Sequence, residues 1–146
     1  MTGRGFLGTQ ASWAADLNLL AQIALLVLLI LAVLRVKKGD LATHHTWMTA
    51  VVIINAVLIV AVMNPTFFRV LPAAIRDPSL KPRMMLPHFL VGTLAELLGL
   101  YAVVAVRMDL PLTLQVRSQK RLMRILAVLW TLSLVGGIAL YVWWYL

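Results

Sequence analysis

The run from His44 to Met63 is 20 residues long and contains no charged side chain. At about 1.5 Å of rise per residue, a helix of this length extends roughly 30 Å, which matches the hydrocarbon core of a bilayer. Because lipid cannot satisfy open backbone groups, such a run has to form a helix. The run therefore predicts a membrane span. Proline cannot continue a helix, so the following Asn64-Pro65 predicts that this one ends there.

Three further apolar runs predict spans at about 17–36, 88–106 and 122–146, beside the span at 44–63. The composition agrees, since 62% of the residues are hydrophobic and the mean hydropathy is +0.95, well above the values of soluble domains. The alternation typical of a membrane barrel is missing from the sequence. We expect an all-α fold: one transmembrane domain over residues 1–146, folded as a four-helix bundle of two helical hairpins.

The connection between the second and third spans is not simply polar. It holds Phe67 and Phe68 beside Arg69 and Arg76, among prolines at 65, 72, 78, 82 and 87. We expect a short segment at 66–76 that lies in the membrane interface, with its aromatic side chains toward the lipid and its arginines toward water.

The basic residues predict the orientation in the membrane. Eight of them lie between spans one and two or at the junction of spans three and four: Arg35, Lys37, Lys38, Arg107, Arg117, Lys120, Arg121 and Arg124. Five lie on the opposite side: Arg4, Arg69, Arg76, Lys81 and Arg83. The bias favours an orientation with both termini outside a cytoplasmic membrane, which we expect to be bacterial or archaeal. The net charge of +8 then indicates basic rims on anionic lipid and no nucleic-acid partner, because the basic residues flank the spans.

Catalytic motifs are missing from the sequence. It has no cysteine, which excludes a thiolate metal site and a thiol nucleophile. It also lacks a glycine-rich phosphate loop, a Ser-His-Asp set and paired carboxylates. We expect that the protein is not an enzyme.

A histidine pair opens the second span and forms the first candidate site, with His44, His45 and Met48 as candidate haem ligands beside Met123 of the fourth span. Imidazole and thioether groups are both axial ligands of haem iron. Neighbouring positions of a helix point about 100° apart, so only one of the two histidines can face a bundle axis. The alternative is that these histidines contact lipid headgroups or cap turns.

A methionine-rich group at the other membrane face forms the second candidate site. Met63 ends the second span, while Met84, Met85 and His88 precede the third. Thioether and imidazole groups suit Cu(I), so the group is a candidate copper site. The alternative is that the methionines fill gaps in apolar packing.

Two polar residues lie at the middle of the membrane, where ionisable groups are costly and therefore candidates for function. Asn55 is central in the second span and Glu96 in the third, so antiparallel neighbours would bring them to equal depth. One interpretation is proton or quinone handling. The other is a protonated Glu96 that hydrogen-bonds to Asn55, or to Thr131 or Ser133 of the fourth span.

The two hairpins share a pattern, because the second span opens with His44 to Met48 and the fourth with Gln119 to Met123, each ending in methionine. This pattern predicts a pseudo-twofold axis along the membrane normal.

Several short motifs resemble a family of uncharacterised four-helix bacterial membrane proteins, some of whose relatives are linked to the biogenesis or function of haem-copper cytochrome oxidases. These motifs are Asp16-Leu17-Asn18-Leu19-Leu20, His44 to Met48, Met63-Asn64-Pro65, and Pro87-His88 followed by Gly92 and Glu96. Members of the family often carry histidine where this chain has Gln119. This departure weakens the expectation that paired histidines from the second and fourth spans hold a haem here.

The resemblance implies a helper or carrier in haem-copper oxidase biogenesis or function. The alternative is a non-catalytic accessory subunit of a larger respiratory or photosynthetic complex, for which four spans and basic rims are sufficient. We expect no tightly bound cofactor, and transient binding of copper is more in keeping with the sequence than binding of haem. The expected partners are membrane lipid and either a larger membrane protein complex or further copies of the chain.

Overall fold

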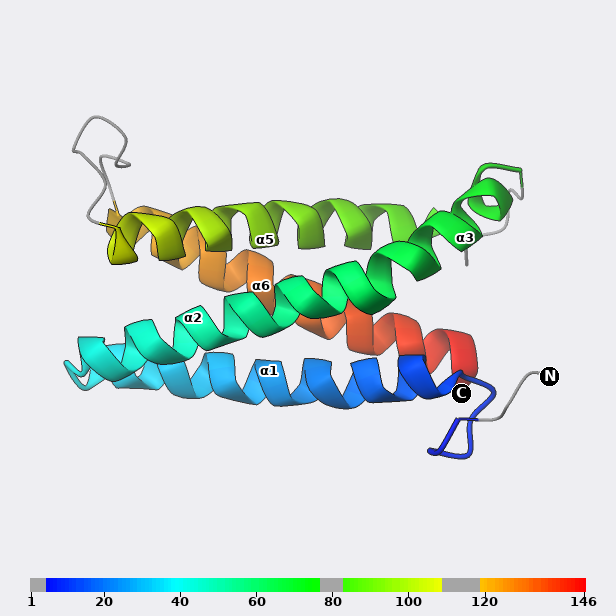
Figure 1. The fold of residues 1–146 in the computed structure, drawn as a ribbon, viewed down its shortest axis with the longest axis horizontal. Coiled ribbons are helices and arrows are strands. Elements are labelled where there is room, and N and C mark those ends of the chain that lie inside the picture. The colour runs from blue at the N-terminus through cyan, green and yellow to red at the C-terminus, as the bar shows by residue number, and fades with distance from the viewer. Residues whose placement is uncertain (1–4, 77–82, 109–118) are drawn as a thin grey trace.

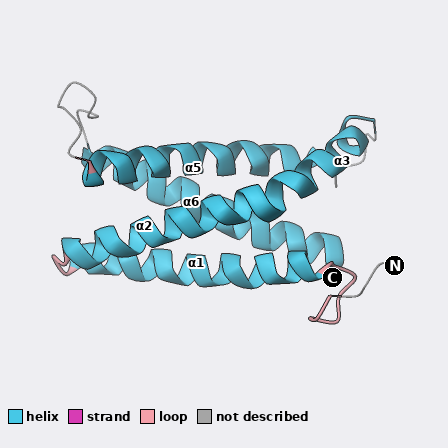
Figure 2. Cartoon of the chain, viewed as in Figure 1, coloured by secondary structure: helices cyan, strands magenta, loops and turns pink. Residues whose placement is uncertain are grey.

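The computed structural model describes residues 5–76, 83–108 and 119–146, and within these ranges the regular structure is entirely helical (Figure 2). The elements are α1 (Trp13–Lys37), α2 (Leu41–Leu58), a π-helical turn η1 (Ile59–Met63), α3 (Asn64–Arg76), α5 (Met85–Arg107) and α6 (Gln119–Tyr145). Four helical stretches are long and apolar enough to cross a membrane: Trp13–Lys37, Leu41–Ala73, Met85–Arg107 and Lys120–Tyr145. The prediction of an all-α membrane protein is confirmed.

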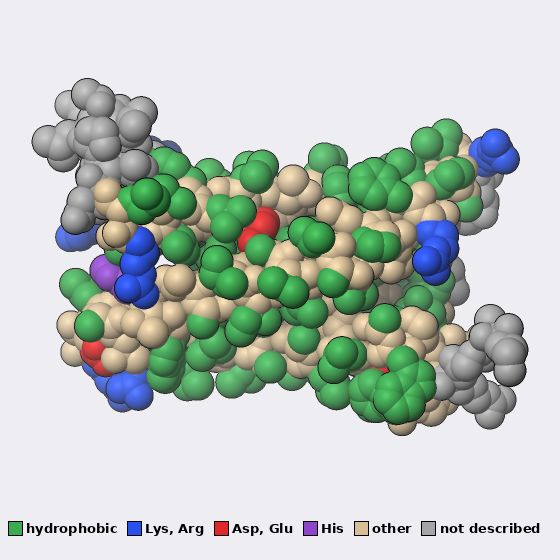
Figure 3. Space-filling model, viewed as in Figure 1, with side chains coloured by type: hydrophobic (Ala, Val, Ile, Leu, Met, Phe, Trp, Pro, Cys, Tyr) green, Lys and Arg blue, Asp and Glu red, His purple; other side chains and the backbone are tan. Residues whose placement is uncertain are grey.

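The four long helices form a bundle in which each helix packs against two others (Figure 1). Helix α1 contacts α2 and α6, and α5 contacts the same two helices. Helices α1 and α5 are therefore diagonal neighbours that face each other across the bundle. The predicted four-helix bundle is confirmed, and the consecutive helices α1 and α2, like α5 and α6, lie side by side. The apolar side chains cover the middle of the bundle, while Lys and Arg gather at its ends (Figure 3).

A tight turn joins α1 to α2. Gly39 adopts a φ of +79°, the left-handed region that favours glycine. Asp40 then caps α2 by accepting a hydrogen bond of 3.1 Å from the Thr43 backbone N–H, and it lies 3.7 Å from Arg35. Hydrogen bonds from Thr43 and the charge of Arg35 hold the pKa of the Asp40 carboxyl below its usual value.

The tightest packing lies at mid-bundle around Trp130 of α6, which is 1% exposed. Its indole Nε1 donates a hydrogen bond of 3.0 Å to the carbonyl of Ala95 in α5. Gly99 makes this approach possible, because a Cβ there would lie 3.2 Å from both Trp130 Nε1 and Val52 Cγ2. A small residue on α5 thus lets α2 and α6 close around it.

The prediction that the second span ends at Asn64-Pro65 is wrong, because the helix continues through η1 into α3. Across η1 the Asn64 N–H reaches the carbonyl of Ile59, five residues back, which is the wider π-type hydrogen bond. Pro65 is the second residue of the following α3, so the chain passes it directly after the wider turn. Wider helical turns allow the chain to pass a proline that would break a regular α-helix.

The expected interfacial segment at 66–76 is helical and belongs to α3, which bends away from the line of α2 (Figure 1). Phe67 is buried and stacks on Phe89 of α5, with ring centroids 3.9 Å apart and planes 8° apart. Phe68, Arg69 and Arg76 are exposed. Only one of the two adjacent phenylalanines therefore points outward, because neighbours on a helix point in different directions.

Candidate functional site: a polar cavity at one end of the bundle

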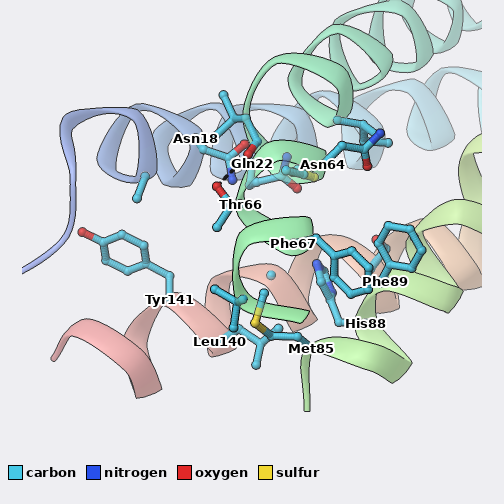
Figure 4. Close-up of a pocket in the computed structure, with 18 of the residues that line it drawn as sticks. Asn18, Gln22, Asn64, Thr66, Phe67, Met85, His88, Phe89, Leu140 and Tyr141 are labelled. Carbon is cyan, nitrogen blue, oxygen red and sulfur yellow. Dashed lines mark hydrogen bonds between the residues drawn. The ribbon is translucent and has the colours of Figure 1, made fainter. Parts of the chain in front are cut away.

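A cavity of about 220 Å³ lies toward the end of the bundle where α1 begins and α6 ends. All of the long helices contribute to it, together with η1 and α3 (Figure 4). Its apolar wall includes Ile59, Val62, Val70 and Leu140. Its polar lining comes from Asn18, Gln22, Asn55, Asn64, Thr66, His88, Thr93, Ser133 and Tyr141. A concave, mostly apolar site with a few polar groups is the usual form of a small-molecule site.

A chain of hydrogen bonds leads from the cavity wall to the middle of the bundle. Gln22 Nε2 donates to Asn55 Oδ1 at 3.3 Å, and Asn55 Nδ2 donates to Glu96 Oε2 at 2.9 Å. All three side chains are buried. The expected pairing of Asn55 with Glu96 is confirmed, whereas Thr131 bonds to the Ala127 carbonyl of its own helix.

Gln22 joins this chain through a hydrogen bond to a neighbouring helix, the role that the sequence favours for Asn18 and Gln22 over a ligand site. The only signal in the sequence is its spacing of four residues from Asn18, which places both on one face of α1. That spacing indicates a helix-packing face without saying which helix it meets.

Two buried oxygen atoms have no hydrogen-bond partner among the described residues: Asn18 Oδ1 and Glu96 Oε1. An acceptor left unpaired in a buried position typically costs about 1–3 kcal/mol. Asn18 forms part of the cavity wall, but its Oδ1 atom has almost no accessible surface.

The imidazole of His88 lies against two adjacent glycines of α6. A Cβ on Gly137 would lie 3.3 Å from His88 Cε1, and one on Gly136 would lie 3.3 Å from Nδ1. These glycines leave room for the ring between α5 and α6. His88 therefore reaches the cavity from α5, on the diagonal opposite to α1.

The predicted copper candidates are partly brought together. Met63, Met85 and His88 line the cavity, and Met85 and His88 are three residues apart on one face of α5. Met84 is not among the lining residues and is 40% exposed. The copper group therefore reduces to three residues in the folded chain.

The predicted haem candidates lie toward the other end of the bundle. His44 Nδ1 donates a hydrogen bond of 2.9 Å to the carbonyl of Ala32 in α1, which holds the α1–α2 hairpin. The His45 ring is 5.6 Å from the His44 ring, and Met48 packs against the core. All three belong to α2, so a second axial ligand would have to come from another helix, such as Met123 of α6, which packs against the same core.

A second buried cluster, which we did not predict, ties the N-terminal segment to the bundle. Asp16 is fully buried and accepts hydrogen bonds from the Leu7 N–H at 2.8 Å, from Thr9 Oγ1 at 3.3 Å, and from the Tyr141 hydroxyl. Tyr141 also lines the cavity. The cluster therefore joins residues near the start of the chain to α6 beside the cavity. An aspartate in a first helical turn is the only sequence signal, and it indicates no more than a favourable charge at a helix start.

We expect the purified protein to be colourless, because the residue that matches His44 in the fourth span is Gln119, a poor ligand for haem iron. Any bound copper should be removable by a competing chelator, since two thioethers and one imidazole form a small neutral ligand set. His88→Ala should weaken Cu(I) binding, whereas His45→Ala serves as the matched control and should not. Metal analysis and a visible spectrum test both statements. A stoichiometric Soret band that disappears in His44→Ala would contradict them.

Comparisons with family models, with curated proteins and with solved structures find no match. The class of protein therefore rests on the fold: an all-helical, multi-pass membrane protein with a polar cavity at one end of its bundle.

Proposed function

We propose that the protein is a non-catalytic membrane helper that holds a small ligand in its cavity and serves haem-copper oxidase biogenesis or function. The cavity is the observation that carries the first half of the proposal. Polar side chains inside a membrane domain are costly. They are found where they pair with one another, form a path for ions or protons, or bind a ligand. The polar side chains that line the cavity, the imidazole of His88 among them, support binding. The link to oxidases comes from the sequence motifs that resemble the oxidase-linked family.

The proposal includes a cytoplasmic membrane with both termini outside, so that the cavity opens toward the outer half of the bilayer. The excess of basic residues at the α1–α2 turn and the start of α6 supports this orientation. Single cysteines in place of Lys38 and Arg76, which lie at opposite ends of the bundle, distinguish the two orientations. Lys38→Cys should react from the cytoplasmic side and Arg76→Cys from the outside; the reverse pattern would contradict the orientation. Ser79 and Ser118, further labelling positions in these connections, lie outside the described residues.

Filling the cavity tests the function in cells. In Gly137→Leu the new side chain would meet His88 and occupy cavity space. We expect oxidase activity in the membranes to fall toward the level of a deletion strain, with the abundance of the variant unchanged. Val135→Leu is the matched control, because it enlarges an exposed side chain on the same helix and should leave the activity intact. Normal oxidase activity in the deletion strain would contradict the proposal.

A further inference from the structure

We infer that Arg107 of α5 and His45 of α2 hold the phosphate group of one anionic phospholipid, at the end of the bundle opposite the cavity. The inference goes beyond the proposed function, because it concerns another part of the molecule and another class of ligand. Three observations carry it: an arginine held between two helices, an excess of positive charge at this end, and lipid-facing apolar side chains next to the arginine.

Arg107 reaches from α5 to α2 at the end of the bundle where these two helices lie apart (Figure 1). Its Nε and Nη2 atoms both donate to Thr49 Oγ1, at 3.4 Å each. The Thr49 hydroxyl itself donates to the His45 carbonyl at 2.7 Å, so its oxygen is left to accept from the guanidinium. These bonds hold the guanidinium beside α2, and its other N–H groups have no acceptor among the described residues.

His45 adds a second donor beside the guanidinium. It lies four residues before Thr49, on the same face of α2, and its partly buried ring is close enough to Arg107 for the positive charge to act on it. Figure 3 shows a histidine side chain beside Lys or Arg side chains at this end of the bundle. A neutral imidazole donates one hydrogen bond, and an arginine presents a fork of donors that matches two phosphate oxygens. The two side chains together suit a phosphate group.

The charge at this end of the bundle favours an anion. Further basic side chains are exposed here: Lys37, Lys38, Lys120, Arg121 and Arg124. In the described part of the chain, the acid at this end is Asp40, which lies 3.7 Å from Arg35. Asp40 therefore offsets the charge of Arg35, whereas Arg107 has a neutral hydroxyl as its partner and keeps its charge uncompensated. An anionic headgroup is attracted to such a basic surface at a membrane interface.

The apolar side chains next to the site indicate that the anion belongs to a lipid. Ile53 lies four residues beyond Thr49 in α2 and is 49% exposed, while Val104 lies three residues before Arg107 in α5 and is 40% exposed. Residues three or four apart share a face of a helix, so a polar end and an apolar stripe are continuous on both helices. A phospholipid has the same order of groups, with its phosphate at the interface and its acyl chains below. A free phosphate ion has no group to place on the apolar stripe.

The test is native mass spectrometry of the purified protein from detergent micelles, titrated with phosphatidylglycerol or with phosphatidylcholine of identical acyl chains. We expect the first phosphatidylglycerol to bind with the lower Kd, because the choline group meets the same positive charges. Arg107→Gln should raise the Kd for phosphatidylglycerol about tenfold, as expected for one lost charge-assisted hydrogen bond. Lys38→Gln is the matched control, because it removes the same charge from an exposed position at the same end, and it should leave this Kd nearly unchanged.

A second variant keeps the test decisive if Arg107→Gln folds poorly. Thr49→Val keeps every charge and the shape of the side chain, but it removes the oxygen that positions the guanidinium. It should raise the Kd for phosphatidylglycerol several-fold although the net charge is unchanged. General attraction to a basic surface depends on charge alone, so an unchanged Kd in Thr49→Val would contradict a built site.

Three further outcomes would overturn the inference. Equal losses of affinity in Arg107→Gln and Lys38→Gln would show a diffuse basic surface, and an equal Kd for the two lipids would show no selection of an anion. Inorganic phosphate in excess should not displace the bound lipid, and its displacement would replace the lipid by a free anion as the ligand. The cavity lies at the other end of the bundle, so the proposed function is tested separately by Gly137→Leu.

Discussion

Replacing Trp130 by alanine is expected to lower the free energy of unfolding by about 3 to 5 kcal/mol, from the cavity that the indole leaves and from the hydrogen bond lost with it. Trp130 is 1% exposed and packs among Leu25, Val52 and Leu134 at the centre of the bundle. In a membrane, helices associate through packing contacts and hydrogen bonds, and not through the expulsion of water. Alanine would remove both, since the indole also donates to the carbonyl of Ala95.

Trp130→Phe is the matched control, because it keeps one aromatic ring while it loses the hydrogen bond and the rest of the indole. We expect it to cost about 0.6 to 2 kcal/mol, the range for a hydrogen bond between membrane helices. Both variants are measured by reversible unfolding in mixed detergent and lipid micelles. A loss in Trp130→Ala that is no larger than in Trp130→Phe would show that the contacts around the indole contribute little.

The second large effect is expected at Glu96. Glu96→Gln should fold nearly as well as the parent, because the amide oxygen can still accept the hydrogen bond that Asn55 donates at 2.9 Å. Glu96→Leu should lower the free energy of unfolding by about 0.6 to 2 kcal/mol, since it removes that bond and leaves the Asn55 amide unpaired. The same unfolding assay measures both.

A double-mutant cycle with Asn55→Leu tests whether the stability lost in Glu96→Leu comes from the Asn55–Glu96 hydrogen bond. If that hydrogen bond is the cause, Glu96→Leu should lower the free energy of unfolding by less when Asn55 is already leucine.

A Glu96→Gln variant that accumulates normally in cells but abolishes function would contradict a packing role of Glu96 and favour proton handling. Neutral amide groups do not relay protons. The Gln22–Asn55 hydrogen bond therefore orients the Glu96 carboxyl group and does not carry protons toward it.

The membrane spans could be predicted from the sequence because they depend on local composition alone. An uncharged run such as 44–63 has to be helical in lipid, whatever it packs against. The pairing of Asn55 with Glu96 could also be predicted, since two residues at the centres of consecutive spans have to share a depth. A third residue of the same chain of hydrogen bonds, Gln22, could not be assigned, because its depth matches many partners.

The path of the chain past Asn64-Pro65 was predicted wrongly, because proline was judged against a regular α-helix. The π-helical turn at Ile59–Met63 changes the hydrogen-bond pattern just before the proline. Likewise, Met84 and Met85 are adjacent in sequence, yet only Met85 lines the cavity. One step along a helix turns the side chain by about 100°, so small changes in where the helix begins decide which residue points inward.

The sequence by itself determined that the chain is an all-helical, multi-pass membrane protein, because long apolar runs leave a lipid-exposed backbone no other structure. It also determined which side chains are available for chemistry. Only the tertiary structure decided which of them meet: Asn18, Gln22 and His88 around one cavity, His44 on a backbone carbonyl, and Asp16 on Tyr141. The physical reason is that depth in a bilayer follows from position along a helix, whereas proximity across a bundle depends on the rotation and crossing of helices packed together.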